Sequence, residues 1–194
     1  LADGMQVTRY AADGPGLFAM SRLDRPDGRW ALGTEYLVVA NNATTPQTAT
    51  FDTWTSRGAF APLYGGVARV TPGASGEVTV TVPPLSVGVW RATQHTERPV
   101  AAPSVTVASP TAGAIVGGRA EVRATLGEDT PSQVSFLYRP VGTSTWTRLG
   151  TDDNAPYRVF HDVSGMPFGT VLEYRVIAKD QTGAFRASST WGVV

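Results

Sequence analysis

Residues 77–90 read EVTVTVPPLSVGVW. Valine at every second position alternates with threonine, so a strand over this stretch has one apolar and one polar face. Pro83 and Pro84 lack backbone N–H donors and therefore break the strand or confine it to a sheet edge. Alternation then resumes up to Trp90. We interpret the stretch as strand segments on either side of a kink, serving two parts of a small β-sandwich, with Val80 in its core.

The rest of the first half has the same character. Strands are predicted at about residues 5–12, 16–24, 35–42, 47–54 and 59–64. Turn residues separate them, as in DRPDG at 24–28 and in the pairs Asn41-Asn42 and Gly65-Gly66. No segment shows a sustained 3.6-residue period with helix caps. The chain is therefore predicted to be all-β, and Phe18 is expected to point into the core.

The chain of 194 residues is long enough for two domains of about 100 residues, each with its own core. Alternation stops in TQHTERPVAAP at 93–103, where Pro99 and Pro103 favour a semi-rigid linker. We therefore predict two β-sandwich domains in series, 1–92 and 104–194, joined by a linker at 93–103.

The composition argues against several classes of partner. Sixteen basic residues balance sixteen acidic ones, so neither nucleic acid nor an anionic membrane surface is an expected partner. Without cysteine, the chain has neither a disulfide nor a Cys-based zinc site. No apolar run approaches the roughly 20 residues that cross a bilayer. The opening residues LADGMQ are not a signal peptide, and we expect the sequence to start within a longer protein.

The first half also resembles a known family in four blocks, taken in order. These are GLFAMSRLD at 16–24, EYLVVANN at 35–42, PLYGG at 62–66 and VPPLS at 82–86. They resemble domain C, the β-domain that follows the catalytic barrel in the α-amylase family of glycoside hydrolases. Domain C performs no chemistry, so the resemblance implies a region without catalytic residues.

The second half resembles the bacterial Ig-like and fibronectin type III-like domains found in secreted glycosidases. The matching blocks are Pro110 to Gly113, Val134 to Tyr138, Asp152 to Tyr157 and Tyr174 to Gly183. Tyr174 is a candidate for the tyrosine corner of such sandwiches, although the fibronectin spacing around it is not met.

Together the two resemblances imply a non-catalytic accessory region of an extracellular bacterial α-amylase-type hydrolase. The first domain would stabilise the upstream catalytic barrel of the same polypeptide, and the second would act as a spacer. We expect a monomer without cofactors. Two alternatives remain open: a carbohydrate-binding module for starch or another α-glucan, and a cell-surface adhesion array of Ig-like domains.

The acidic residues give no catalytic pair. Glycoside hydrolysis needs two carboxylates that face each other across the scissile bond. Most of the acidic residues are expected in turns or at outward strand positions, namely Asp24, Asp27, Asp152 and Asp153, and Glu121 and Glu173. We therefore predict no catalytic residues in this chain.

Two other patterns imitate functional sites. His161-Asp162 resembles the His-Asp ending of a barrel motif, but it follows Ala-Pro-Tyr in the Ig-like half, and we interpret it as a strand end. Asp152, Asp153 and Asn154 offer oxygen ligands for calcium, but the distal glutamate of a calcium loop is missing, which favours a solvated turn. We predict no metal site.

Exposed aromatic rings are the remaining candidates, because tryptophan faces stack on sugar rings. Trp54 and Trp90 close strands and are assigned to the core, whereas Trp30 follows a turn and Trp146 lies in the polar run TSTWT. We take Trp30 and Trp146 as the carbohydrate-binding candidates. Because they lie in different domains, we expect no binding of α-glucan or only millimolar binding.

Overall fold

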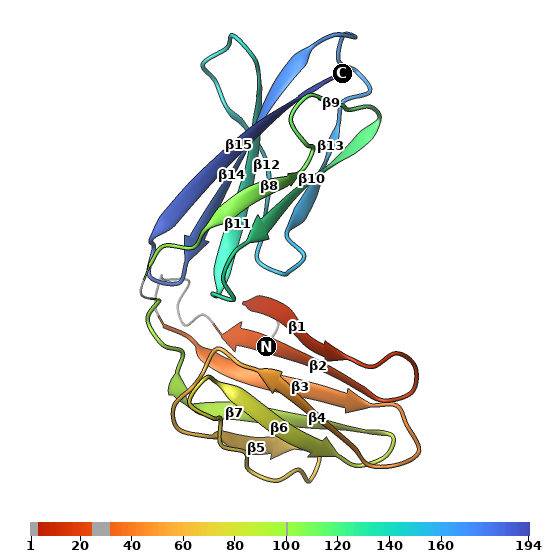
Figure 1. Ribbon diagram of the computed structural model, residues 1–194, viewed down its shortest axis with the longest axis vertical. Helices are drawn as coiled ribbons and strands as arrows, with labels where there is room; N and C mark the ends of the chain where they lie inside the picture. Colours follow the sequence, from red (N-terminus) through yellow and green to blue (C-terminus); the bar gives the residue numbers. More distant parts are fainter. Residues whose placement is uncertain (1–3, 25–31, 100) are drawn as a thin grey trace. The chain divides into compact units, whose positions relative to one another are not determined.

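The computed structural model describes residues 4–24, 32–99 and 101–194, and the chain divides into two units, the second of which begins at Pro99. Each unit consists of two β-sheets (Figure 1). The described residues form no helix, and thus none that is long and apolar enough to cross a membrane. The predicted all-β fold is confirmed. β7 (Ser86–His95) extends into the predicted linker, so residues 93–95 belong to a strand.

The first unit contains a five-stranded antiparallel sheet in the order β1-β2-β3-β7-β5 and a pair formed by β4 and β6. The bounds in the larger sheet, besides β7, are Met5–Ala11 (β1), Leu17–Asp24 (β2), Thr34–Asn41 (β3) and Phe60–Tyr64 (β5). The smaller sheet consists of Gln47–Asp52 (β4) and Glu77–Val82 (β6). The Pro83-Pro84 kink separates β6 from β7, so the chain passes from one sheet to the other there, as predicted.

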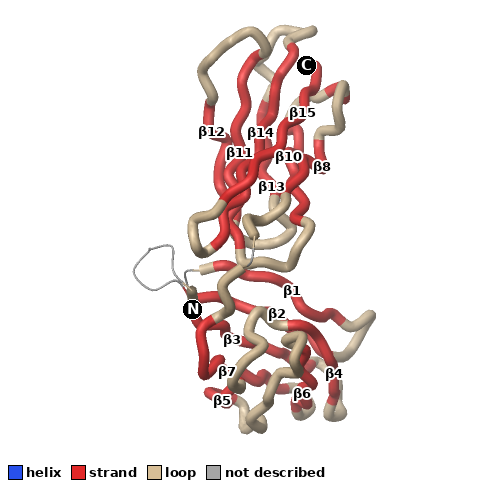
Figure 2. The backbone as a smooth tube through the Cα atoms, turned by 60° about the vertical axis from the view of Figure 1, so that its left-hand side comes forward, coloured by secondary structure: helices blue, strands red, loops and turns tan. Residues whose placement is uncertain are grey.

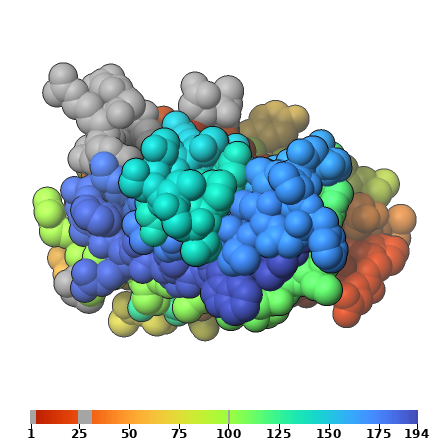
Figure 3. Space-filling view, turned by 90° about the horizontal axis from the view of Figure 1, so that it is seen from above, coloured from red at the N-terminus to blue at the C-terminus, as the bar shows by residue number. Residues whose placement is uncertain are grey.

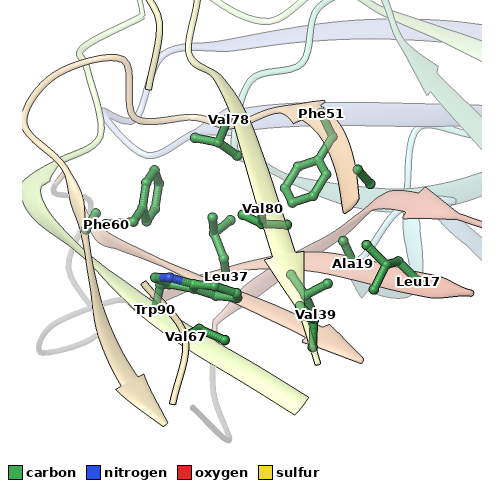
Figure 4. Close-up of a cluster of buried hydrophobic side chains, with 13 residues drawn as sticks. Leu17, Ala19, Leu37, Val39, Phe51, Phe60, Val67, Val78, Val80 and Trp90 are labelled. Carbon is green, nitrogen blue, oxygen red and sulfur yellow. The ribbon is translucent and has the colours of Figure 1, made fainter. Parts of the chain in front are cut away.

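The core of this unit fills the space between the two sheets (Figure 4). Val80 is fully buried, which confirms the prediction from the Val/Thr alternation. On the opposite face of β6, Thr79 and Thr81 form hydrogen bonds to Thr50 and Thr48 of β4. Trp90 is also buried, as predicted, and its indole N–H donates to the carbonyl of Ala68 at 2.7 Å.

Phe18 is not in the core, and the prediction that it points inward is wrong. Its side chain is 43% exposed, whereas its neighbours Leu17 and Ala19 are buried. Successive residues of a strand point to opposite faces, so the burial of Leu17 and Ala19 places Phe18 on the outer face of the sheet. β2 has apolar residues on both faces, and its pattern therefore does not show which face is buried.

The second unit is a sandwich of a three-stranded sheet, β13-β10-β8, and a five-stranded sheet, β12-β11-β14-β15-β9 (Figure 2). The bounds in the smaller sheet are Val105–Ser109 (β8), Arg119–Leu126 (β10) and Arg158–Asp162 (β13). The larger sheet consists of Ala114–Ile115 (β9), Ser132–Pro140 (β11), Thr147–Asp152 (β12), Val171–Asp180 (β14) and Phe185–Val193 (β15). β9 pairs in parallel with β15, and the other pairs are antiparallel.

Alternate residues of β14 point into this second core. Leu172, Tyr174, Val176 and Ala178 are fully buried, while Glu173 and Arg175 lie on the outer face of the five-stranded sheet. The outer face of this sheet therefore carries charged side chains of β14.

Candidate functional site

Of the two predicted sugar-binding residues, Trp30 lies outside the described residues. Trp146 is partly buried in the connection that precedes β12. Two guanidinium groups lie against its indole ring, with the Cζ atoms of Arg139 and Arg175 at 4.5 and 4.3 Å from the ring centroid. Such cation–π contacts hold the ring in place, and the ring area that they cover is not available to a sugar.

The same two arginines hold Glu173. Arg139 donates from Nε to Glu173 Oε2 at 2.7 Å, and its Nη2 lies 2.6 Å from the same oxygen. Arg175 Nη2 lies 3.6 Å from Glu173 Oε1. Two cations and one anion thus form a compact group on the outer face of β11 and β14, and Trp146 packs against it.

Trp191 lies next to this group and was not recognised from the sequence. It is the cross-strand neighbour of Glu173 on β15, and its side chain is 46% exposed. A Cβ atom at Gly113 would lie 3.1 Å from the indole Cη2 of Trp191, so this glycine lets the ring pack closely against the turn that precedes β9. β15 has the sequence FRASSTWGV, in which the apolar residues alternate with polar ones or glycine, but the more apolar side is exposed, so the pattern does not indicate the direction of Trp191. The choice of Trp30 and Trp146 as the candidates thus missed an exposed tryptophan.

His161 lies inside the second unit and is 5% exposed. Its Nδ1 is 3.1 Å from the hydroxyl of Tyr174, and its ring packs on Tyr138 with centroids 4.0 Å apart. Burial lowers the pKa of His161, and the same effect raises the pKa of Tyr174 to about 12. The partner of the Tyr174 hydroxyl is therefore a side chain of the facing sheet, which differs from the backbone contact of a tyrosine corner.

Of the acidic residues that the sequence placed in turns, Asp24 and Asp152 are instead the last residues of β2 and β12, Asp153 follows β12, and Asp27 lies outside the described residues. Asp152 accepts hydrogen bonds from the backbone N–H groups of Asn154 and Arg158, both at 3.0 Å. Asp162 accepts from the N–H of Ser164, and this bond lowers the pKa of its carboxyl. Among the described residues, no group of three His, Cys, Asp or Glu side chains lies close enough to hold a metal ion.

A buried charged cluster in the first unit was also missed. The Glu35 side chain is fully buried, and its Oε1 accepts hydrogen bonds from the Ser21 hydroxyl at 2.5 Å and from the Trp54 backbone N–H at 3.1 Å. Arg9 Nη2 is 3.5 Å from the same oxygen, and Arg9 Nε donates to Ser21 Oγ at 2.8 Å. Burial raises the pKa of Glu35, while Arg9 and these hydrogen bonds oppose the rise.

A β-bulge places Arg9 in this cluster. The register of β1 against β2 shifts between Thr8 and Tyr10, so Arg9 is an extra residue in the strand. A bulge redirects the side chain of the extra residue. The guanidinium therefore points inward and packs over the Trp54 ring, 4.5 Å from its centroid. The cluster closes one end of the sandwich and lies beside the small apolar cluster of Met5, Leu23 and Trp54.

Part of the outer face of the five-stranded sheet in the first unit is apolar, beside a more polar row of Gln6, Arg22, Tyr36 and Arg91 on the same face. Ala11, Phe18, Ala40 and Val87 form one row across β1, β2, β3 and β7. Beside it lies a second row of Thr8, Met20, Val38 and Val89. The exposed apolar side chains on and next to these rows are Phe18, Tyr64, Leu85 and Val87. A depression of about 480 Å³ lies at the Phe18 end of the face. We call this surface the Phe18 face.

Comparison with known proteins gives a relative for almost the whole chain. The chain is similar to part of an α-amylase. It is 41% identical to an α-amylase of Streptomyces lividans over 184 residues, which is 94% of this chain and 19% of that enzyme. The chain thus spans about a fifth of the length of the relative. No family model matches the sequence.

Solved structures give a weaker likeness. A tetra-tandem repeat from the extending region of a large adhesion protein has 15% identity and a TM-score of 0.36, covering 93% of this chain and 57% of that one. The FN1–FN3 domains of chicken CNTN1 have 16% identity and a TM-score of 0.37, covering 97% and 66%. Scores this low do not establish a shared arrangement of two units.

Proposed function

We propose that this chain is a non-catalytic accessory region of a secreted α-amylase-type glycoside hydrolase, in which the first unit binds the catalytic domain of the same polypeptide. The observation that carries the proposal is the 41% identity to an α-amylase over a segment that is only 19% of that enzyme. An identity at this level over 184 residues favours a shared role for the matching segments.

The Phe18 face supports the docking part of the proposal. Contiguous exposed apolar patches are uncommon on soluble monomers and mark surfaces that another protein covers. Phe18 and Leu85 are 43% and 70% exposed in this chain, and they flank a depression that a protruding side chain could fill. The occupant to which we assign this face is the catalytic domain, because the relative carries this segment within one polypeptide.

The acidic side chains support the non-catalytic part. Asp152 and Asp162 hold turns through backbone N–H groups, and Glu173 is engaged by Arg139 and Arg175. Glu35 is enclosed in the first unit, where no substrate could reach it. We therefore expect no turnover of starch, pullulan or maltooligosaccharides by this chain alone. Turnover that survives repurification and is lost in Asp162→Ala would overturn this expectation.

The docking part can be tested in trans. The S. lividans α-amylase is prepared without the segment that matches this chain, and its melting temperature is measured with and without a molar excess of the chain. We expect the wild-type chain to raise the melting temperature and the double variant Phe18→Asp/Val87→Asp to leave it unchanged. Phe168→Asp, at a 96% exposed residue of the second unit, is the matched control and should act like wild type.

Two results would count against docking through this face. One is an equal effect of the wild-type chain and the double variant. The other is the absence of any effect of the wild-type chain on the truncated enzyme. The melting temperature of the double variant alone shows that its first unit is folded.

A further inference from the structure

A shallow depression of about 500 Å³ lies on the outer face of the five-stranded sheet in the second unit. Its lining residues are Val141, Val171, Glu173, Ser189, Thr190 and Trp191. It lies at the end of the sheet where the β11–β12 connection (teal in Figure 3) meets the β13–β14 connection (light blue), and the Val141 N–H donates to the Val171 carbonyl at 2.8 Å. Small-molecule sites are concave and mostly apolar, with a few fixed polar groups, and this depression has those properties.

The apolar part of the depression is formed by Trp191 and two valines. Trp191 is 46% exposed, Val171 is 36% exposed and Val141 is 58% exposed. The ring of Trp191 packs next to Gly113, where a Cβ atom would lie 3.1 Å from Cη2. A half-exposed indole provides a flat apolar surface.

The polar part is Glu173, which lies directly across the strands from Trp191. Arg139 and Arg175 fix the orientation of the carboxylate, and Trp146 in turn packs against both guanidinium groups. A carboxylate has about four acceptor positions, so Glu173 can still accept hydrogen bonds from a ligand. The Ser189 hydroxyl accepts from Arg175 Nε at 3.1 Å and keeps its own proton to donate.

The charges decide the class of ligand. Arg139 and Arg175 outweigh the charge of Glu173, so the depression offers no excess negative charge to attract a cation. Of these three groups only the Glu173 carboxylate lines the depression, and it disfavours an anion there. A flat apolar wall beside a fixed acceptor and hydroxyl groups therefore suits a neutral molecule with one apolar face and several hydroxyl groups, which describes a pyranose ring.

We propose that this depression is a sugar subsite, in which the C–H face of one glucosyl unit of an α-glucan stacks on Trp191 and its hydroxyl groups donate to Glu173. The pyranose class follows from the site itself. The choice of α-glucan rests on the proposed function, because it derives from the α-amylase relative. Trp146 acts here as a positioning residue, since it contacts the arginines that hold Glu173.

The test is a titration of the full 194-residue protein with maltoheptaose, followed by the indole N–H signals of the tryptophans in two-dimensional NMR. We expect a millimolar dissociation constant and a shift of the Trp191 signal. Trp191→Ala should weaken binding at least tenfold. Phe185→Ala, an exposed aromatic on the same strand outside the depression, is the matched control and should bind like wild type.

A second pair of measurements separates this inference from the proposed function. No binding of maltoheptaose or cellohexaose, or equal binding by wild type and Trp191→Ala, would overturn the subsite and leave the docking proposal untouched. Binding of cellohexaose but not maltoheptaose, lost in Trp191→Ala, would overturn the assignment to α-glucan and also weigh against an α-amylase-type parent. Glu173→Gln keeps the shape of the side chain, and we expect it to weaken binding about fivefold, an effect that a purely aromatic site would not show.

Discussion

His161 and Tyr174 face each other between the two sheets of the second unit, with the imidazole Nδ1 3.1 Å from the tyrosine hydroxyl. Both residues are buried, and each gives the other its polar partner in an otherwise apolar core. The sequence suggested His161 as part of a barrel-like His-Asp motif and Tyr174 as a tyrosine corner. In the structure the two residues instead form a buried hydrogen-bonded pair. It makes the stability of the unit sensitive to small chemical changes.

Removal of the Tyr174 hydroxyl should destabilise the second unit. Tyr174→Phe keeps the ring and leaves His161 Nδ1 without this partner in a buried place. The loss of a buried hydrogen bond with one member left behind costs about 1–3 kcal/mol. Urea unfolding followed by NMR signals of the second unit measures the change. Tyr64→Phe, at an exposed tyrosine of the first unit, is the control and should unfold like wild type. An unchanged midpoint for Tyr174→Phe would show that the hydrogen bond contributes nothing.

The stability of the second unit should depend on pH through His161. Burial lowers the pKa of this group in the folded state below its ordinary value of 6.5. Above about pH 6.5, neither state binds the proton, and the contribution to stability is complete. As the pH falls below that value, the unfolded chain binds a proton that the folded unit does not, so the free energy of unfolding decreases until the folded pKa is reached.

Unfolding measured between pH 7.5 and pH 5 should therefore show this loss of stability, and His161→Gln should make the profile flatter. His95→Gln, at an exposed residue of β7, is the matched control and should keep the slope of the wild type. An identical slope in His161→Gln would assign the pH dependence to other groups.

Two phenylalanines of the first unit should respond differently to the same truncation. Phe60 is fully buried, and Phe60→Ala should cost about 3–5 kcal/mol. Phe18 is 43% exposed, and Phe18→Ala should stay within about 0.5 kcal/mol of wild type in this chain alone. Thermal unfolding of the two variants gives the comparison. A large loss of stability in Phe18→Ala would contradict its outward orientation and the Phe18 face.

The buried cluster of Arg9 and Glu35 should tolerate joint replacement better than single replacement. Glu35→Leu removes the carboxylate that faces a buried guanidinium, and breaking a buried ion pair from one side costs about 3–5 kcal/mol. Arg9→Met/Glu35→Leu removes both charges, and we expect it to recover at least half of that loss. A double-mutant cycle by chemical denaturation measures the coupling. Additive losses would show that the two side chains do not act as a pair.

The sequence predicted most of the fold because several strands have two chemically distinct faces. β6 has valine on one face and threonine on the other, and its orientation followed directly from this pattern. β2 has apolar residues on both faces, so the period of two was visible, but the choice between Phe18 and Leu17 was not. When both faces of a strand are equally apolar, the sequence does not show which face is buried, and either set of alternate residues could point into the core.

The sites were less predictable, for two physical reasons. The bulge inserts Arg9 as an extra residue in β1 and so changes the face to which its side chain points. Whether a strand contains such a bulge depends on how it pairs with the neighbouring strand, which the local composition does not show. β15 does alternate, but its more apolar side, with Phe185, Ala187 and Trp191, is the exposed one, so alternation gave the wrong direction for Trp191. Its partner Glu173 was correctly placed on an outward position, but the contact between them exists only through the register of β14 and β15.

The strand order of the first unit constrains how this protein is made. β7 lies between β3 and β5, although it is the last strand of the unit in the sequence. β3 and β5 are synthesised before β7. Until β7 is present, each of them has an unpaired edge on the side where β7 will pair. The sheet closes only when His95 has left the exit tunnel. By that time translation has entered the second unit, so a ribosome that stalls shortly before Ser86 would hold a first unit that is nearly complete in length and still without the strand that closes its larger sheet.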